Sequence, residues 1–428
     1  MEKMVNSRLV WFLESTGSFS RRQFGFRQNL CTIDPLTFLK RFIQTGFIEN
    51  KQAFAVFFDL QKAYDNCWRG GIIRQLVQWS ISGRMLTFLK AFLTDRLLKV
   101  RVGTSHSRPF TQEEGVPQGS VLSVTLFAAA INGIVSSLPV GIQGSLFVDD
   151  FVIYCKATTA AEACLNLQAG INSALQWATN RGFVFSPEKT KALRFTRSTR
   201  VEVIPTLTLG GTLLEYVPSI TFLGVVLDSK LLFKLHIDNL VVRLKRDLNL
   251  LRCISSQDWG AERAVLLTIL RSLCRSKIDY ACQIYGSAAV SHLQKITTVY
   301  NSGLRVCTGA LRTSPVESLY VDAQEVPLEL RRAELTLRYM VKISGITTNP
   351  NSRYIFHPND SFESRPRASK PPEVRLHNEL MSLNVDQGGV CVRTTPRNPP
   401  WKIPPITSCH TLMKKSTASQ TVLQTTYS

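Results

Sequence analysis

The 428-residue chain lacks the apolar segments that secreted and membrane proteins carry. Residues 1–9 contain no apolar core of a signal peptide, and no apolar stretch is both long enough and sufficiently free of charge to cross a bilayer. The ten cysteines never occur with Cys-x-x-Cys spacing, which argues against a zinc knuckle or finger. Free cysteines without a secretory pattern indicate a reducing compartment. We therefore expect an intracellular protein of the nucleus, the cytoplasm or both, with no membrane partner.

Acidic residues are scarce relative to basic ones. The chain has 31 Asp and Glu against 51 Lys and Arg, for a formal net charge of +20. This excess favours a polyanionic partner, with nucleic acid first, although charge alone fits a basic protein without such a partner equally well. The length allows two or three domains, and 44% hydrophobic residues can form a large core.

Two adjacent carboxylates, Asp149 and Asp150, interrupt the apolar run of residues 145–154. Acidic residues are rarely buried without a partner, and neighbouring carboxylates raise each other's pKa. A hard divalent cation relieves that cost, because it takes carboxylate oxygens as ligands. The pair therefore predicts a metal site at the tip of a β-hairpin. A plain hairpin with a polar tip is the alternative.

A third carboxylate, Asp59, ends an upstream apolar strand, residues 53–59, and could complete the metal site. Between the two carboxylate sites lies the segment 115–123 (GVPQGSVLS), which combines the turn residues Gly and Pro with a polar Gln118. An apolar helical pattern follows it. The order is therefore a carboxylate strand, a Gly-Pro loop with a helix, and a carboxylate hairpin.

These three segments resemble motifs A, B and C of a reverse transcriptase: residues 58–65 (FDLQKAYD), 115–120 (GVPQGS) and 147–150 (FVDD). The resemblance is greatest to non-long-terminal-repeat retrotransposons of the jockey-like or LINE-like type. Further segments follow the order of that family. Residues 186–191 resemble motif D, residues 222–225 resemble motif E, and residues 23–27 (QFGFR) resemble the segment that precedes motif A.

The resemblance implies an RNA-directed DNA polymerase that adds deoxynucleotides to a primer 3′-hydroxyl by two-metal nucleotidyl transfer. Asp59 and Asp149 would bridge two Mg²⁺ or Mn²⁺ ions, and Asp150 would be the neighbouring carboxylate. The implied partners are an RNA template, a DNA primer or target DNA, and deoxynucleoside triphosphates.

The resemblance also assigns residues to the incoming nucleotide. Tyr64 would pack under the sugar and exclude a 2′-hydroxyl, with a core tyrosine as the alternative. Gln118 and Gly119 would lie near the nucleotide and the template base. Lys189 would contact the triphosphate or protonate the pyrophosphate, although a solvated turn lysine fits nearly as well.

Phe222, Leu223 and Gly224 would hold the primer end, with strand core as the alternative for the first two. Two other polar residues receive structural roles instead. Asp65 is predicted to cap the next helix rather than to bind metal, and His236 to be an ordinary helix residue rather than a ligand.

The predicted fold is α+β: a right-hand polymerase palm with partial fingers and a helical thumb, in which helices lie on one side of an antiparallel sheet. We expect partial fingers at 1–52, the palm at 53–230, a helical thumb or connector at 231–346, and a Pro-rich linker or disordered tail at 347–428. Helical basic residues in the thumb are candidates for phosphate contact: Arg243, Lys245, Arg246, Arg252, Arg263, Arg271, Arg275 and Lys277.

The sequence also departs from the family pattern. Family members have a finger segment upstream of this match and often a ribonuclease H domain beyond such a linker, so we expect a chain truncated at both ends. Val124 stands where the family usually has proline. One alternative function is an inactive relic that at most binds nucleic acid. Another is an RNA-directed RNA polymerase, which Tyr64 and the Pro-Gln-Gly loop disfavour.

Overall fold

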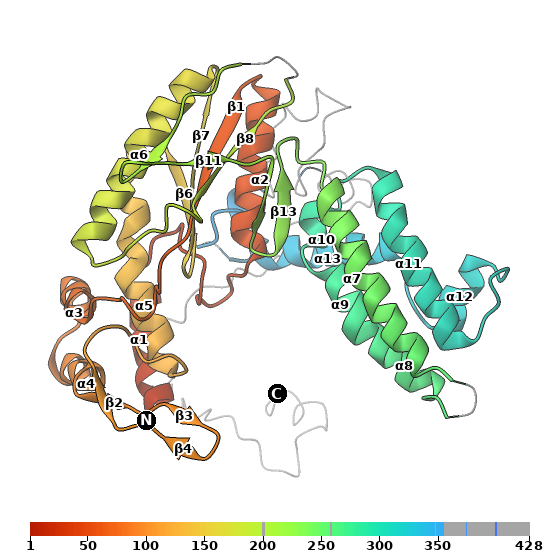
Figure 1. Ribbon diagram of the computed structural model, residues 1–428, viewed down its shortest axis with the longest axis horizontal. Helices are drawn as coiled ribbons and strands as arrows, with labels where there is room; N and C mark the ends of the chain where they lie inside the picture. Colours follow the sequence, from red (N-terminus) through yellow and green to blue (C-terminus); the bar gives the residue numbers. More distant parts are fainter. Residues whose placement is uncertain (199–201, 257–258, 347, 355–373, 375–398, 400–428) are drawn as a thin grey trace, which may run out of the picture. The chain divides into compact units, whose positions relative to one another are not determined.

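A computed structural model describes residues 1–198, 202–256, 259–346, 348–354, 374 and 399. The described residues up to 374 belong to one compact unit. This unit is built on a five-stranded sheet with the spatial order β11-β8-β1-β7-β6 (Figure 1). Its strands are β1 (Gln52–Phe58), β6 (Gln143–Phe147), β7 (Asp150–Ala157), β8 (Lys191–Phe195) and β11 (Glu215–Tyr216).

Strand β1 lies in the middle of this sheet and is buried on both faces. It pairs antiparallel with β7 and β8, whereas the short β11 runs parallel to β8. Because strand side chains alternate between faces, Phe54, Val56 and Phe58 enter one hydrophobic core. Ala53, Ala55 and Phe57 enter the other. This explains why the strand reads as an uninterrupted apolar run.

Helices cover both faces of the sheet. Helix α6 (Ala160–Asn180) packs on β1 and β7 from one side. Helix α2 (Ile33–Ile48) contacts β1, β6 and β7 through the core on the other side. The prediction that helices lie on one side of the sheet is therefore wrong, because an apolar strand buried on both faces needs a cover on each.

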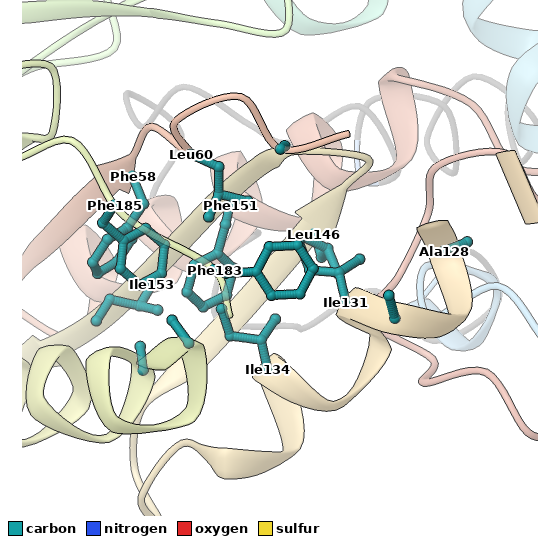
Figure 2. Packing of buried hydrophobic residues seen from close by; sticks show 14 of the residues in the cluster. Phe58, Leu60, Ala128, Ile131, Ile134, Leu146, Phe151, Ile153, Phe183 and Phe185 are labelled. Carbon is teal, nitrogen blue, oxygen red and sulfur yellow. The ribbon is translucent and has the colours of Figure 1, made fainter. Parts of the chain in front are cut away.

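The first core lies beneath α6 and extends to four further helices: α1 (Glu2–Ser15), α3 (Arg69–Gln78), α4 (Gly83–Leu93) and α5 (Val121–Ile131), the last continued by a 3₁₀ turn at Asn132–Ser137. Figure 2 shows the aromatic part of this core. The ring centroid of Phe58 lies 5.2 Å from that of Phe151 and 4.7 Å from that of Phe185. These rings fix the end of β1, which Asp59 follows, and the start of β7, where Asp149 and Asp150 precede Phe151.

The second core continues into a helical region, as the sequence predicts for residues after 234. Its helices are α7 (Lys234–Cys253), α8 (Arg263–Leu270), α9 (Ser276–Asp279), α10 (Cys282–Tyr285), α11 (Val290–Thr308), α12 (Val316–Asp322) and α13 (Leu328–Ser344), with a π-helical turn at Arg271–Arg275 and a 3₁₀ turn at Ser352–Tyr354. The apolar stripe of α7, which includes Leu240, Leu244 and Leu248, is buried.

Short strand pairs lie outside the main sheet. They are β2 (Arg96–Leu98) with β5 (Phe110–Gln112), β3 (Arg101–Val102) with β4 (Ser105–His106), β9 (Thr208–Leu209) with β10 (Thr212–Leu213), and β12 (Ser219–Phe222) with β13 (Val225–Asp228). Residues 219–228 do not form one continuous strand. Leu223 and Gly224 adopt φ of 46° and 76°, so the chain reverses there into a hairpin.

The Pro-rich tail predicted for residues 347–428 lies outside the described residues, apart from 348–354, 374 and 399. The domain limits at residues 52, 230 and 346 remain predictions. Within the described ranges, no helix combines the length and the apolar character that crossing a membrane requires.

Candidate active site

The two adjacent carboxylates lie at the tip of the β6–β7 hairpin, as the sequence predicts. Phe147 pairs with Asp150, so Val148 and Asp149 form a two-residue turn. Val148 has a φ of 61°, which is strained for a β-branched residue. Such strain persists where the surrounding structure over-determines the conformation.

The segment Arg22–Gly25 supports this turn. Phe24 donates its N–H to the Leu146 carbonyl at 2.8 Å, and the Leu146 N–H donates to the Arg22 carbonyl at 2.9 Å. Gly25 is buried, and a Cβ added there would lie 2.4 Å from the backbone nitrogen of Val148. Only glycine therefore allows this segment to approach the strained turn so closely.

Asp59 joins the hairpin carboxylates at the same end of the sheet. Phe58, the last residue of β1, pairs with Phe151, so Asp59 leaves β1 beside Asp150 at the start of β7. The Asp150 side chain remains accessible to solvent. Partial burial nevertheless raises its pKa to about 6, with further contributions from the charges of Asp149 and Asp59. The three carboxylates therefore act on one another electrostatically.

In the described part of the chain, no group of three or more His, Cys, Asp or Glu side chains meets the geometry for holding a metal ion. Lys189 supplies a positive charge at this site, with its Nζ 3.6 Å from Oδ2 of Asp59. Carboxylates disfavour close approach when no cation separates them. Their hard oxygens are nonetheless the donor chemistry that a divalent cation requires, and a bound cation would offset the repulsion that raises the pKa of Asp150.

The loop 186–191 lies against the Asp59 backbone. The Ser186 N–H donates to the Asp59 carbonyl at 2.8 Å, and the Asp59 N–H donates to Oγ1 of Thr190 at 3.4 Å. Thr190 in turn donates to the Ser186 carbonyl at 2.7 Å. These bonds hold Lys189 next to Asp59, while its side chain stays 73% exposed and free to reach a ligand.

Tyr64 lies between the carboxylates and helix α5. Its ring stacks on Phe127 with a centroid distance of 4.3 Å and an interplanar angle of 17°. Burial, then the charge of Asp149, raises the pKa of Tyr64 to about 12. The side chain is therefore a neutral, fixed ring within electrostatic reach of the hairpin carboxylate.

The Gly-Pro loop is tied to the segment after Asp59. Nε2 of Gln118 donates to Oδ1 of Asp65 at 2.9 Å, and Gly119 adopts a φ of 90°. The prediction that Asp65 caps the next helix is wrong: α3 begins at Arg69 after Trp68 and has no side-chain cap. Asp65 orients Gln118 instead.

The predicted primer-binding residues form the β12–β13 hairpin. The Phe222 side chain is buried in the second core, where its ring lies 5.3 Å from that of Phe57. In the turn, Leu223 is half-buried and Gly224 is exposed. Tyr280 of the helical region donates its hydroxyl to the Leu223 carbonyl at 2.7 Å, and a Cβ on Gly224 would lie 3.2 Å from its ring.

His236 is a buried packing residue, in agreement with the sequence interpretation. Its Nδ1 accepts the N–H of Val226 in β13 at 3.3 Å, and its ring lies 5.1 Å from Tyr285. Burial, then the charge of Arg243, lowers the pKa of His236 to about 4. The imidazole is therefore neutral at pH 7.

The predicted phosphate-binding residues of the helical region divide into two groups. Glu325 is buried and binds Arg271 at 2.6 Å and Arg275 at 2.8 Å. Lys277 pairs with Asp247 at 2.6 Å, and Arg263 pairs with Asp322 at 2.8 Å. The remaining four are exposed on α7 and form no ion pair with a described carboxylate: Arg243, Lys245, Arg246 and Arg252.

Three supporting residues were not predicted from the sequence. Arg69 donates Nε to the Gly115 carbonyl at 2.7 Å and NH1 to the Gln112 carbonyl at 2.6 Å, which fixes the Gly-Pro loop. Tyr280 and Gly25 support the two hairpins. The sequence held one local sign that a turn needs such support, namely Val148 at a turn position that usually takes Gly or Asn. The supporting contacts themselves join segments that are far apart in the chain, so no local pattern predicts them.

A family profile described as "Reverse transcriptase (RNA-dependent DNA polymerase)" matches residues 1–227. The chain is 26% identical over 82% of its length to the RNA-directed DNA polymerase from mobile element jockey of Drosophila melanogaster. It is 28% identical over 72% of its length to the probable RNA-directed DNA polymerase from transposon BS of the same species. The matches span 38% and 34% of those two relatives.

Among solved structures, apo telomerase from Candida tropicalis aligns with a TM-score of 0.41 and 11% identity, over 83% of this chain and 59% of the telomerase chain.

Proposed function

The chain belongs to the reverse transcriptase family, and from this we propose that it is an RNA-directed DNA polymerase acting at the sheet edge formed by Asp59, Asp149 and Asp150. The observation that carries the proposal is the convergence of these three carboxylates at adjacent strand ends. Their mutual influence on the pKa of Asp150 supports it. The family also implies a divalent metal cofactor, and we propose Mg²⁺ or Mn²⁺.

Asp59 and Asp149 would hold the divalent cations, with Asp150 as the neighbouring carboxylate. A pair of divalent cations, when bound, stabilises the attacking and leaving oxygens of nucleotidyl transfer. Lys189 then contacts the triphosphate instead of Asp59, because its exposed side chain can move away from the carboxylate. The hydrogen bonds of the 186–191 loop keep this lysine close to the leaving phosphates.

Tyr64 is the proposed selector of deoxynucleotides. Its ring is fixed on Phe127 next to Asp149, so a 2′-hydroxyl on the substrate sugar would collide with it. Gln118, oriented by Asp65, and the backbone of Gly119 are proposed to contact the nucleotide and the template base. A Tyr64→Ala variant should therefore incorporate ribonucleotides more readily than the parent protein.

The primer end is proposed to bind the Leu223–Gly224 turn, because Phe222 is occupied in the core. Arg243, Lys245, Arg246 and Arg252 on α7 are proposed to contact the phosphates of the primer–template duplex. In this arrangement the sheet is the palm, the helical region is the thumb, and the parts before β1 contribute to the fingers.

Primer extension on an RNA template, with purified protein, Mg²⁺ or Mn²⁺ and deoxynucleotides, tests the proposal. We expect extension by the parent protein and none above background by Asp149→Asn and by Asp150→Asn. Glu317→Gln, an exposed residue of α12 away from the sheet edge, is the control for loss of a surface carboxylate.

Absence of extension by a correctly folded parent protein would contradict the proposed activity. Salt-sensitive binding of nucleic acid by that same protein would then favour the alternative of an inactive relic. Extension that persists in both Asp variants would show that the polymerase site lies elsewhere.

A further inference from the structure

The four short strands between α4 and the Gly-Pro loop form an arm without a core. Strands β2 and β5 pair at its base, and β3 and β4 pair toward its tip. Every residue from 97 to 111 is exposed. A two-stranded hairpin is marginally stable in water without a packing surface, so this arm has the character of a segment that is completed by a ligand.

The arm carries only positive charge. Residues 96–112 contain Arg96, Lys99, Arg101 and Arg108 and no acidic residue. Arg101 donates Nε to the Gly103 carbonyl at 2.8 Å, and no ion pair joins Lys99, Arg101 or Arg108 to a carboxylate in the described ranges. The exposed cations of α7 likewise form no ion pair with a described carboxylate, whereas Lys295 pairs with Asp238 at 2.6 Å. The arm therefore presents unneutralised cations to its partner.

Apolar side chains alternate with these cations. Leu97 is 68% exposed, Val102 is 75% exposed and Phe110 is 47% exposed. Contiguous exposed apolar surface marks interaction sites. Cations combined with an exposed aromatic ring match a single-stranded nucleic acid, which offers phosphates to the cations and bases for stacking.

The base of the arm is fixed to the loop that contains Gln118. Arg69 donates to the carbonyls of Gln112 and Gly115, one at the end of β5 and the other at the start of the loop. Thr104 at the tip lies eight residues from Gln112, so an extended arm reaches roughly 26 Å from its base. The arm therefore begins beside the residues proposed to contact the template base and extends away from them.

We propose that residues 96–112 bind the single-stranded RNA template before it enters the active site. Lys99, Arg101 and Arg108 contact phosphates, and Phe110 stacks on a base. The proposal rests on the proposed polymerase function for the identity of the strand. A second copy of this arm is a poorer partner, because both arms would bring only positive charge to the contact.

Equilibrium binding of a single-stranded RNA at several salt concentrations tests the proposal, with no deoxynucleotides present. The variant Lys99→Gln/Arg101→Gln/Arg108→Gln should bind more weakly. Its negative slope of log K against log salt should become shallower by about 2, since each phosphate contact contributes about 0.7 to the steepness. The matched control, Lys230→Gln/Arg312→Gln/Lys342→Gln, removes three exposed cations outside the arm and should keep the slope of the parent.

The aromatic contact is tested separately. Phe110→Ala should weaken RNA binding several-fold or more, because stacking contributes about 1–3 kcal/mol per base. Phe110→Leu, which keeps an apolar side chain, should weaken binding as well, since it also lacks the ring. Thermal unfolding of each variant should match the parent, because the arm lies outside both cores.

An arm variant that keeps the parent's affinity and salt slope would overturn the proposal. Loss of self-association in light scattering, with RNA binding unchanged, would overturn it in favour of a contact between copies. If the parent fails to extend primers while the arm variants still lose RNA binding, the arm is an RNA-binding site, and the polymerase proposal fails together with the identity of that RNA as a template.

Discussion

Two hairpins of this molecule have opposite surroundings. The β6–β7 hairpin carries the carboxylates at a strained turn and is enclosed by the Arg22–Gly25 segment, β1 and α6. The arm at residues 96–112 has no strained non-glycine turn residue beyond its start at Asp95 and no buried residue between 97 and 111. The β6–β7 hairpin therefore holds its carboxylates in a fixed position, whereas the arm exposes its basic side chains to solvent.

The difference shows that the packing around a hairpin determines whether it can hold side chains in a fixed, strained position. Strain at Val148 is tolerated because hydrogen bonds and close packing leave the turn no alternative. The arm has few contacts that could stabilise a strained conformation. Its structure therefore depends on the hydrogen bonds between its strands and, under the proposal above, on a bound ligand. The β12–β13 hairpin is intermediate: its turn has positive φ, and Tyr280 and His236 hold it from the helical region.

The largest effect is expected from Gly25→Ala. The new Cβ would lie 2.4 Å from the Val148 backbone nitrogen, so the carboxylate turn must move. A displacement of about 1 Å in a catalytic group costs roughly 100-fold in rate, and we expect primer extension to fall by about that factor.

Gly46→Ala in α2 is the matched control, because its added Cβ would make ordinary contacts at 3.6 Å and beyond. Extension rates and thermal unfolding are measured for both variants. Full activity in Gly25→Ala would show that the turn does not depend on this close approach.

His236→Asn should change the pH dependence of stability. The pKa of His236 is lowered to about 4 in the folded state from an ordinary value near 6.5. The folded state therefore resists protonation, and the associated stabilisation is present above pH 6.5 and lost as pH falls toward 4. The loss amounts to about 3 kcal/mol.

Chemical unfolding between pH 4 and 7 measures this effect. The Asn variant should lose the His236 part of the slope and keep the remainder, because its amide does not titrate. An identical slope in parent and variant would mean that the pKa of His236 is the same in the folded and the unfolded protein.

Tyr280→Phe should weaken use of the primer end. The variant loses the hydroxyl that donates to the Leu223 carbonyl at 2.7 Å but keeps the ring against Gly224. A hydrogen bond of this kind contributes about 0.5–1.5 kcal/mol, so the KM for primer–template should rise several-fold with little change in the KM for deoxynucleotides.

Thr32→Val removes only the longer contact of Tyr280, at 3.3 Å, and serves as the comparison. Steady-state extension with varied primer–template and varied deoxynucleotide separates the two constants. A rise confined to the deoxynucleotide KM would argue against a role at the primer end.

The smallest effect is expected from Gly103→Ala in the arm. Gly103 has a φ of 59°, so alanine is strained there by about 1–2 kcal/mol. The arm belongs to neither core, so this cost should appear as faster hydrogen exchange over residues 97–111 and not in the midpoint of thermal unfolding. A clear drop in the midpoint would show that the arm contributes to global stability.

The sequence by itself predicted the strand before Asp59, the carboxylate hairpin, the helix after the Gly-Pro loop and their order, because periodicity and turn residues are local properties. It predicted the meeting of Asp59 with the hairpin through the family resemblance. It missed that helices cover both faces of the sheet and that the chain reverses at 223–224, since both follow from packing and backbone conformation rather than from pattern.

Only the tertiary structure decided which polar residues support others. Asp65 orients Gln118, and Arg69 fixes the Gly-Pro loop. Glu325 forms ion pairs with two arginines that the sequence had suggested as phosphate contacts. Each of these contacts joins residues that are distant in the chain, and a side chain's type does not say which distant partner reaches it. The residue types alone indicated which chemical groups this protein could use. The fold decided which of those residues support other residues and which face a ligand.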